Sequence, residues 1–231
     1  MPESQPDPPL RTERLGEGIG AFWLDRPEKR NALDGALVEA LIAAFTSERW
    51  RAVVLGTSDP RGFCGGADLS LADDERALVS MRLYDLYRVM TSLPAPIVVA
   101  VEGAAVGGGA QLAIAGDMRI GDARAMFRFP GPGHGLAVGS WGLPSLVGRG
   151  RALDLCLTSR DVGADEALRI GLLDRIADDP RGAAVELAER IAALDETAVE
   201  RVKRVVRSAS GLDDALALES VGNASWSGAI P

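Results

Sequence analysis

Short apolar runs alternate along the chain with longer stretches whose apolar residues recur at helical spacing. The runs predict strands buried on both faces, because such strands have no polar side; they are residues 19–25, 52–55, 97–101, 117–121, 125–129 and 172–176. The stretches predict helices over residues 34–45, 75–93, 151–157, 165–170, 182–194, 197–208 and 212–220. No repeat or linker divides the sequence. The pattern therefore predicts one α/β domain whose second half is mainly helical.

The N-terminal residues and the overall charge narrow the class of protein. Residues 1–17 contain four prolines and few apolar side chains, so they predict a flexible leader without a signal sequence. The net charge of −8 argues against a nucleic-acid-binding surface. Two cysteines and one histidine are too few for a disulfide framework or a zinc site. No apolar stretch is long enough to span a membrane, so we expect a cytoplasmic protein without a metal.

Two glycine-rich segments follow apolar strands, at residues 62–69 and 103–112. The second contains three consecutive glycines and leads into an apolar helix, whose first N–H groups have no partner within the helix. If the first segment adds another N–H, the two groups form an oxyanion hole for a carbonyl oxygen that becomes negative. Tight turns and close packing explain the glycines equally well. No dinucleotide-binding, phosphate-binding or nucleophile-elbow motif is complete in the sequence.

The sequence resembles the crotonase (enoyl-CoA hydratase/isomerase) superfamily over residues 19–210. Residues 26–33, 63–69 and 103–112 are similar to its three signatures, and residues 117–120 and 157–176 to later conserved segments. The resemblance implies an α/β spiral of β-β-α turns, which we expect over residues 18–180. It also implies a helical C-terminal region, here shortened to residues 181–231, that belongs to the same functional unit and forms homo-trimers or hexamers. Acyl-CoA thioesters are the ligands that the resemblance implies, with no further cofactor.

The resemblance also implies positions for the binding groups. Gly65 and Gly108 would donate the two oxyanion N–H bonds. The CoA nucleotide would lie against Arg30 and Ala32, with Arg30 contacting a phosphate. Its adenine would lie near three consecutive residues, Ala67, Asp68 and Leu69.

The acids of a hydratase of this superfamily are missing. Such an enzyme needs two glutamates to activate water and to deliver a proton, but their positions are held here by Gln111 and Gly131. His134, the one histidine, is a candidate general base in the glycine-rich loop that follows. We expect Trp141 to line the acyl pocket, with ordinary core packing as the alternative.

Three hypotheses follow from these residues. The first is an acyl-CoA-binding protein of fatty acid or lipid metabolism that retains the oxyanion hole and has lost ordinary hydratase chemistry. The second is an active hydratase- or isomerase-type lyase that uses a non-standard acid/base such as His134. The third is a partner-binding protein with a vestigial pocket.

Overall fold

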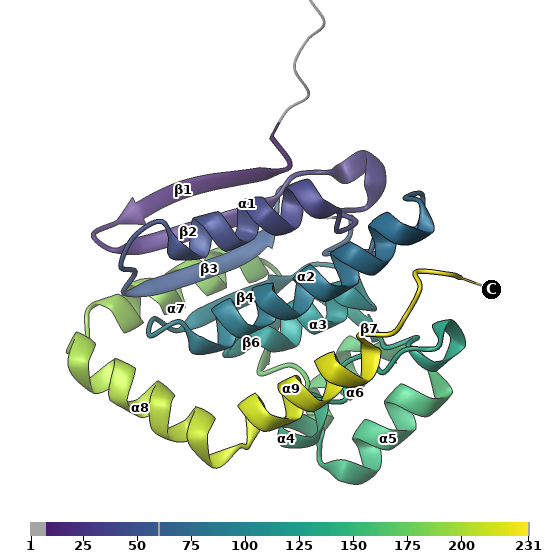
Figure 1. The fold of residues 1–231 in the computed structure, drawn as a ribbon. Coiled ribbons are helices and arrows are strands. Elements are labelled where there is room, and N and C mark those ends of the chain that lie inside the picture. The colour runs from purple at the N-terminus through teal and green to yellow at the C-terminus, as the bar shows by residue number, and fades with distance from the viewer. Residues whose placement is uncertain (1–7, 60, 231) are drawn as a thin grey trace, which may run out of the picture.

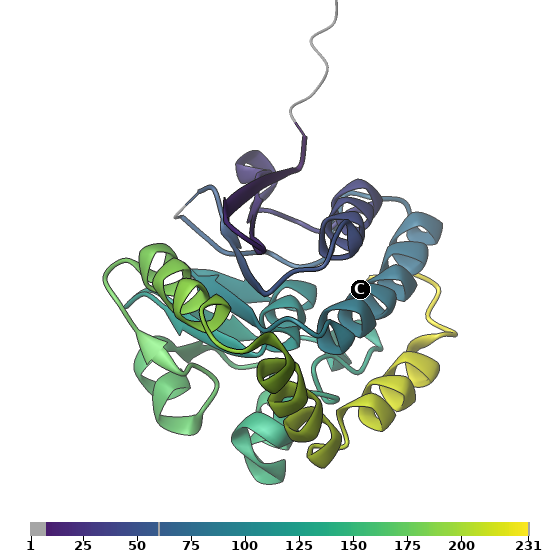
Figure 2. The ribbon, with the colours of Figure 1, turned by 90° about the vertical axis from the view of Figure 1, so that its left-hand side faces the viewer.

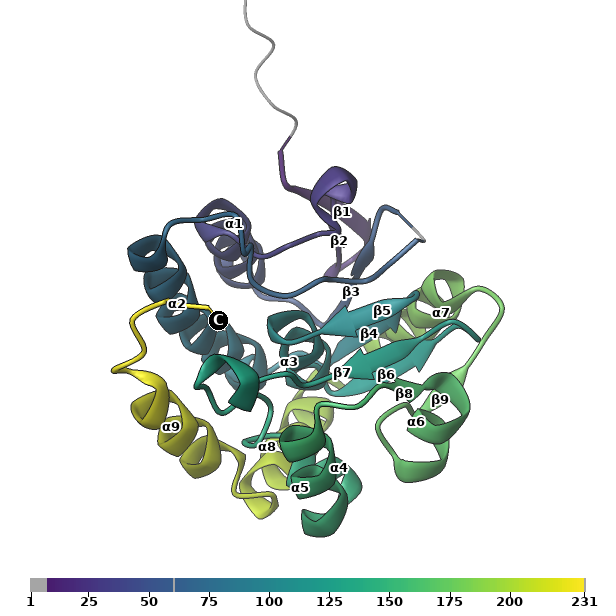
Figure 3. The ribbon, with the colours of Figure 1, turned by 90° about the vertical axis from the view of Figure 1, so that its right-hand side faces the viewer.

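The computed structural model describes residues 8–59 and 61–230 and contains two sheets. The larger sheet has the order β1-β2-β3-β4-β6-β9, and the smaller has the order β5-β7-β8 (Figures 1 and 3). The strands of the larger sheet are β1 (Leu10–Gly16), β2 (Ile19–Leu24), β3 (Ala52–Thr57), β4 (Ile97–Val101), β6 (Met118–Gly121) and β9 (Arg175–Ile176). Those of the smaller sheet are β5 (Ala104–Val106), β7 (Met126–Arg128) and β8 (Val162–Gly163). All neighbours are parallel except β1/β2 and β7/β8.

The chain passes between the two sheets in successive turns, which confirms the predicted spiral. It leaves β4 for β5, returns through α3 to β6, and leaves again for β7, so that β5 and β7 lie over β4 and β6 (Figure 3). The described helices are α1 (Gly35–Thr46), α2 (Asp73–Ser92), α3 (Gly108–Ala115), α4 (Leu143–Val147), α5 (Arg149–Thr158), α6 (Ala164–Ile170), α7 (Pro180–Ala192), α8 (Glu196–Ala209) and α9 (Leu212–Asn223). Short elements β5, β8 and α4 are absent from the sequence-based prediction, because periodicity needs longer stretches to show.

The prediction of a flexible leader is wrong for Leu10–Gly16, which pairs antiparallel with β2 as strand β1. Only Leu10 of this edge strand is buried, and the polar residues that follow it face outward. An edge strand held mainly by backbone hydrogen bonds therefore shows little apolar pattern in the sequence. Residues 1–7 of the predicted leader lie outside the described residues.

Two apolar cores cover the two faces of the larger sheet. Trp23, Val54 and Val98 pack with α7 on one face, whereas Leu55 and Val99 face α1, α2, α3 and the smaller sheet. Figure 2 shows α7 on the opposite side of the sheet from α1 and α2. Helix α7, which begins at the predicted boundary near residue 180, packs on this face of the sheet as far as Ala192.

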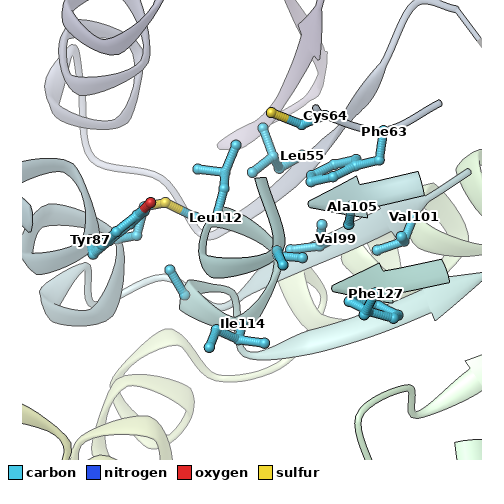
Figure 4. Close-up of a cluster of buried hydrophobic side chains, with 14 of the residues drawn as sticks. Leu55, Phe63, Cys64, Tyr87, Val99, Val101, Ala105, Leu112, Ile114 and Phe127 are labelled. Carbon is cyan, nitrogen blue, oxygen red and sulfur yellow. The ribbon is translucent and has the colours of Figure 1, made fainter. Parts of the chain in front are cut away.

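Helix α3 runs through the middle of the larger core. Its Leu112 lies between Leu55 and Tyr87, and its Ile114 points to the opposite side (Figure 4). The C-terminal helices then cross the lower side of the molecule, and α9 runs back beside α2 (Figure 1). No described helix is long and apolar enough to cross a membrane. The fold thus fixes the first turn of α3 between the glycine-rich loop, α2 and the segment contacted by α9.

Candidate functional site

Asn31 links two loops, residues 26–33 and 62–66, through hydrogen bonds of its side chain. Its backbone is left-handed, with a φ of 53°, and its side chain is buried. Its amide nitrogen donates to Thr57 Oγ1 at 2.8 Å and to the Phe63 carbonyl at 3.0 Å, while its amide oxygen accepts from the Arg26 N–H at 2.8 Å. A buried amide with all these partners fixes the loop of residues 26–33 against residues 62–66.

The first turn of α3 lies directly against this second loop. A Cβ atom on Gly109 would come within 2.3 Å of the Cys64 carbonyl oxygen, so only glycine allows this approach. A Cβ atom on Gly108 would lie 3.6 Å from the Ala67 nitrogen, and one on Gly66 3.4 Å from the Gly108 nitrogen. Gly108 is the first residue of α3, so its N–H has no partner within the helix. The backbone amides of Ala67 and Gly108 are therefore neighbours.

The prediction that Gly65 donates an oxyanion bond is wrong. Its N–H already donates to the Arg30 carbonyl at 2.9 Å. Ala67, two residues later, has an N–H that donates to no acceptor among residues 8–59 and 61–230. The loop turns at Gly66, where φ is 97°, and this turn separates the two amides. The Arg30 carbonyl, which comes from a loop distant in sequence, determines which amide stays free. The motif itself therefore does not show it.

Gln111 and Trp141 meet in the core beside this turn. The Gln111 Oε1 atom accepts from the Gly139 N–H and from the Trp141 indole N–H, both at 2.9 Å. The indole stacks on Tyr87 with ring centroids 5.8 Å apart, and the Tyr87 hydroxyl donates to the Gly108 carbonyl at 3.0 Å. A chain of contacts thus connects the first missing-acid position to the first turn of α3.

The second missing-acid position has no room for a side chain. A Cβ atom on Gly131 would lie 2.6 Å from the Leu136 carbonyl oxygen and 2.8 Å from Val138 side-chain atoms. His134 ends the short 3-10 helix Pro132–His134 and is half-buried. Its Nδ1 atom is buried and has no hydrogen-bond partner within the described part of the chain. The loop therefore brings no carboxylate to orient this imidazole.

Glu219 of α9 is a carboxylate that the sequence analysis missed. Its Oε1 atom accepts from the Tyr84 hydroxyl at 3.0 Å and from the Gly139 N–H at 3.2 Å. Its Oε2 atom accepts from the Trp141 N–H at 3.0 Å and from the Ser140 hydroxyl. Burial raises the pKa of Glu219, although these hydrogen bonds oppose the shift. The one signal in the sequence is its position three residues after the buried Leu216, on the inward face of the helix.

The predicted nucleotide contacts divide into exposed and buried groups. Arg30 is exposed, and its side chain forms no hydrogen bond or ion pair with the described residues. Leu69 is 54% exposed. Asp68 is buried instead and accepts from the Ser70 N–H at 3.0 Å, so it holds the loop. The Ala32 carbonyl accepts from the Arg26 guanidinium.

A cavity of about 830 Å³ lies at the other end of α3, away from these residues. It is bounded by α7, α8 and the C-terminal end of α3, and its lining includes Ile114, Ile191 and Val202. Neither the paired amides nor Trp141 belong to this lining. The paired amides of Ala67 and Gly108, and not this cavity, are therefore the candidate functional site. No group of three potential ligands for a metal ion occurs among the residues that the structure describes.

The two-sheet spiral, with its paired amides at the start of a central helix, defines a crotonase-fold protein. Residues 14–221 match the family described as enoyl-CoA hydratase/isomerase, and the chain belongs to this family. A relative from Mycobacterium leprae, named probable enoyl-CoA hydratase echA6, is 38% identical over 208 residues, which are 86% of this chain and 83% of the relative. A counterpart named echA12 from the same organism is 34% identical over 88% of this chain and 77% of its own length.

Solved structures of the same family have the same fold. The crystal structure of an enoyl-CoA hydratase/isomerase from Xanthobacter autotrophicus Py2 superposes with a TM-score of 0.83 at 27% identity, covering 95% of this chain and 88% of that one. The corresponding structure from Pseudoalteromonas atlantica T6c has a TM-score of 0.83 at 29% identity, with coverage of 94% and 91%.

Proposed function

We propose that this chain binds acyl-CoA thioesters and holds the thioester carbonyl oxygen between the N–H groups of Ala67 and Gly108. The observation that carries this proposal is the adjacency of these two amides at the N-terminus of α3. The helix macrodipole adds partial positive charge at that point, which favours an oxygen that carries or develops negative charge. In such a site the protein contributes to binding and polarisation without any titrating side chain.

Arg30 and the exposed Leu69 are the groups that we propose for the CoA nucleotide. The net charge of the protein is −8, so a phosphate needs a local cation. Arg30 supplies one, because its guanidinium is exposed and has no carboxylate partner among the described residues. The loop of residues 65–69 lies next to Arg30, because the Gly65 N–H donates to the Arg30 carbonyl.

The two-glutamate hydration reaction is not part of this proposal. Gln111 does not titrate, and its oxygen is occupied by two buried N–H groups. The Gly131 position is filled by the loop itself. We therefore infer a protein of fatty acid or lipid metabolism that binds acyl-CoA, in the cytoplasm, without adding water to the enoyl group.

We also propose that the chain assembles as a homo-trimer or hexamer. None of the residues of α8 is buried, and its Val202, Val205 and Val206 side chains are 64%, 60% and 65% exposed. Such an apolar helix face favours contact with a second copy of the chain. Sedimentation velocity should report a species at least three times the monomer mass.

Titration calorimetry with short- and long-chain 2-enoyl-CoA tests the binding proposal. A saturable signal with no continuing heat is the expected result. Continuing heat after each injection would mean turnover, and would favour the lyase alternative with His134→Ala as its first variant. A complete lack of signal with every chain length would leave the partner-binding alternative.

Gly108→Pro and Gly108→Ala form a matched pair for the amide. Both variants place a Cβ atom 3.2 Å from the Leu33 and Leu83 methyl groups, but proline alone removes the N–H. Loss of one hydrogen bond to a carbonyl should weaken binding about fivefold relative to the alanine variant. Equal affinities of the two variants would refute the role of this N–H.

A further inference from the structure

A carboxylate from the C-terminal helix holds the loop that contacts Gln111 and Tyr87 beside the candidate site. Glu219 is 5% exposed and contacts three consecutive residues of this loop, Gly139, Ser140 and Trp141. Its partners in the loop are 78 to 80 positions away along the chain. No acid/base position of the family motifs includes Glu219, and the proposed function does not use it.

The arrangement around Glu219 requires a carboxylate. Two of its partners are backbone N–H groups, which donate only, and both of its oxygens receive one of them. An amide side chain would face one of these N–H groups with its own NH₂ group. Four donors for two oxygens also leave the carboxylate little freedom to act as an acid or base.

Asn223, one helical turn later, contacts the same loop. Its amide oxygen accepts from the Ala137 N–H at 3.0 Å, and its amide nitrogen donates to the Ala137 carbonyl at 2.6 Å and to the Tyr84 hydroxyl at 2.7 Å. Tyr84 in turn donates to Glu219. Within the described part of the chain, α9 is therefore hydrogen-bonded to the loop and to α2 through its side chains.

These contacts lead to the paired amides. Glu219 holds the backbone of Gly139 and Trp141, and both residues donate to Gln111. The Trp141 ring stacks on Tyr87, whose hydroxyl donates to the Gly108 carbonyl in the first turn of α3.

We propose that Glu219 is a positioning residue of the acyl-CoA site. It holds the segment of residues 139–141 so that Trp141 supports the first turn of α3, through Gln111 and Tyr87. This inference rests on the proposed function. It assigns to α9 of the same chain a role in acyl recognition, and none in the transfer of a proton.

Calorimetry with Glu219→Gln tests this role, using octanoyl-CoA and free CoA as the two ligands. The variant should bind octanoyl-CoA on the order of tenfold more weakly, because two buried donors lose a proper acceptor. Its affinity for free CoA should stay within about twofold, since the nucleotide contacts lie on another loop. Asp214→Asn, an exposed substitution on the same helix, is the control and should change neither affinity.

Trp141→Phe shows whether Glu219 acts through the indole. This variant should reproduce the loss for octanoyl-CoA, and adding Glu219→Gln to it should weaken binding little further. In the ligand-free protein, the indole N–H resonance of Trp141 should move in Glu219→Gln, a change that is measurable even if that variant is too unstable for calorimetry.

The outcomes separate the two proposals. Wild-type protein that binds no acyl-CoA would overturn both of them. Normal wild-type binding that Glu219→Gln leaves unchanged would overturn the role of Glu219 alone. Equal losses for octanoyl-CoA and free CoA would also overturn it, because they indicate general destabilisation.

Discussion

Replacement of Gln111 by leucine tests whether this residue is a structural acceptor in the core. Leucine is similar in size but offers no acceptor for the two N–H groups that share the Gln111 oxygen. Gly139 keeps a second acceptor, Glu219, at 3.2 Å, whereas the Trp141 indole N–H loses its partner. One buried donor is then left unsatisfied, which costs about 1–3 kcal/mol.

A double-mutant cycle isolates this energy from changes in packing. Trp141→Phe removes the indole donor, so Gln111→Leu should cost less in that background than in the wild type. The coupling energy should be about 1–3 kcal/mol, because it reports the unsatisfied donor and cancels much of the change in buried area. Trp226→Phe serves as the matched control, since this half-buried indole has no contact with Gln111 among the described hydrogen bonds.

Urea unfolding followed by circular dichroism measures the four free energies at one fixed protein concentration. The slopes of the four curves must agree for the comparison to hold. A coupling energy below about 0.5 kcal/mol, or one equal to that of the Trp226 control, would refute the assignment of Gln111 as an acceptor for Trp141.

Three further predictions concern the acids and the thiols. The double variant Gln111→Glu/Gly131→Glu should have a lower Tm and should not hydrate 2-enoyl-CoA, as measured by the absorbance of the enoyl thioester. Measurable hydration would contradict the finding that position 131 has no room for a side chain. Burial raises the pKa of Cys64 to about 12 and that of Cys156 to about 11, so neither thiol should react with a disulfide reagent at pH 8 until urea unfolds the protein; a fast-reacting thiol in the native state would be inconsistent with this. Because burial raises the pKa of Glu219, its contribution to the free energy of unfolding is greatest while it is protonated and falls as the pH rises through the folded-state pKa. Gln111→Glu adds a second carboxylate at the same N–H, so stability should fall more steeply than in the wild type as the pH rises above the ordinary carboxyl pKa, and parallel pH profiles of the two proteins would argue against this proximity.

Local patterns in the sequence were sufficient to predict most of the fold. The wholly apolar run Ile97–Val101 is a buried strand, as predicted, because both faces of the larger sheet are covered. The predicted helix over residues 34–45 is α1, and Asp34 caps it by accepting from the Leu37 N–H at 2.9 Å. Strand β1 escaped prediction because it lies at an edge and buries a single side chain.

The candidate site depends on contacts that no local pattern contains. The sequence motif identifies the loop before Ala67, but the choice between its amides is made by the Arg30 carbonyl, which takes the Gly65 N–H. Glu219 is separated from the Gly139 N–H by 80 positions, so its place in the site could not be read from spacing. Both features arise from tertiary contacts between segments that are each ordinary in sequence.

Gln111 and Glu219 are best understood as a pair. Both place an oxygen on the Gly139 N–H, so a second carboxylate at position 111 would set two negative charges around a single donor in a buried site. Such an arrangement favours protonation of one of them and weakens the fold at neutral pH. A neutral amide accepts the same two bonds without this repulsion. With the Glu219 side chain already on this N–H, glutamine is thus the residue type that keeps Trp141 in place, and the position of the first acid is occupied by a structural group.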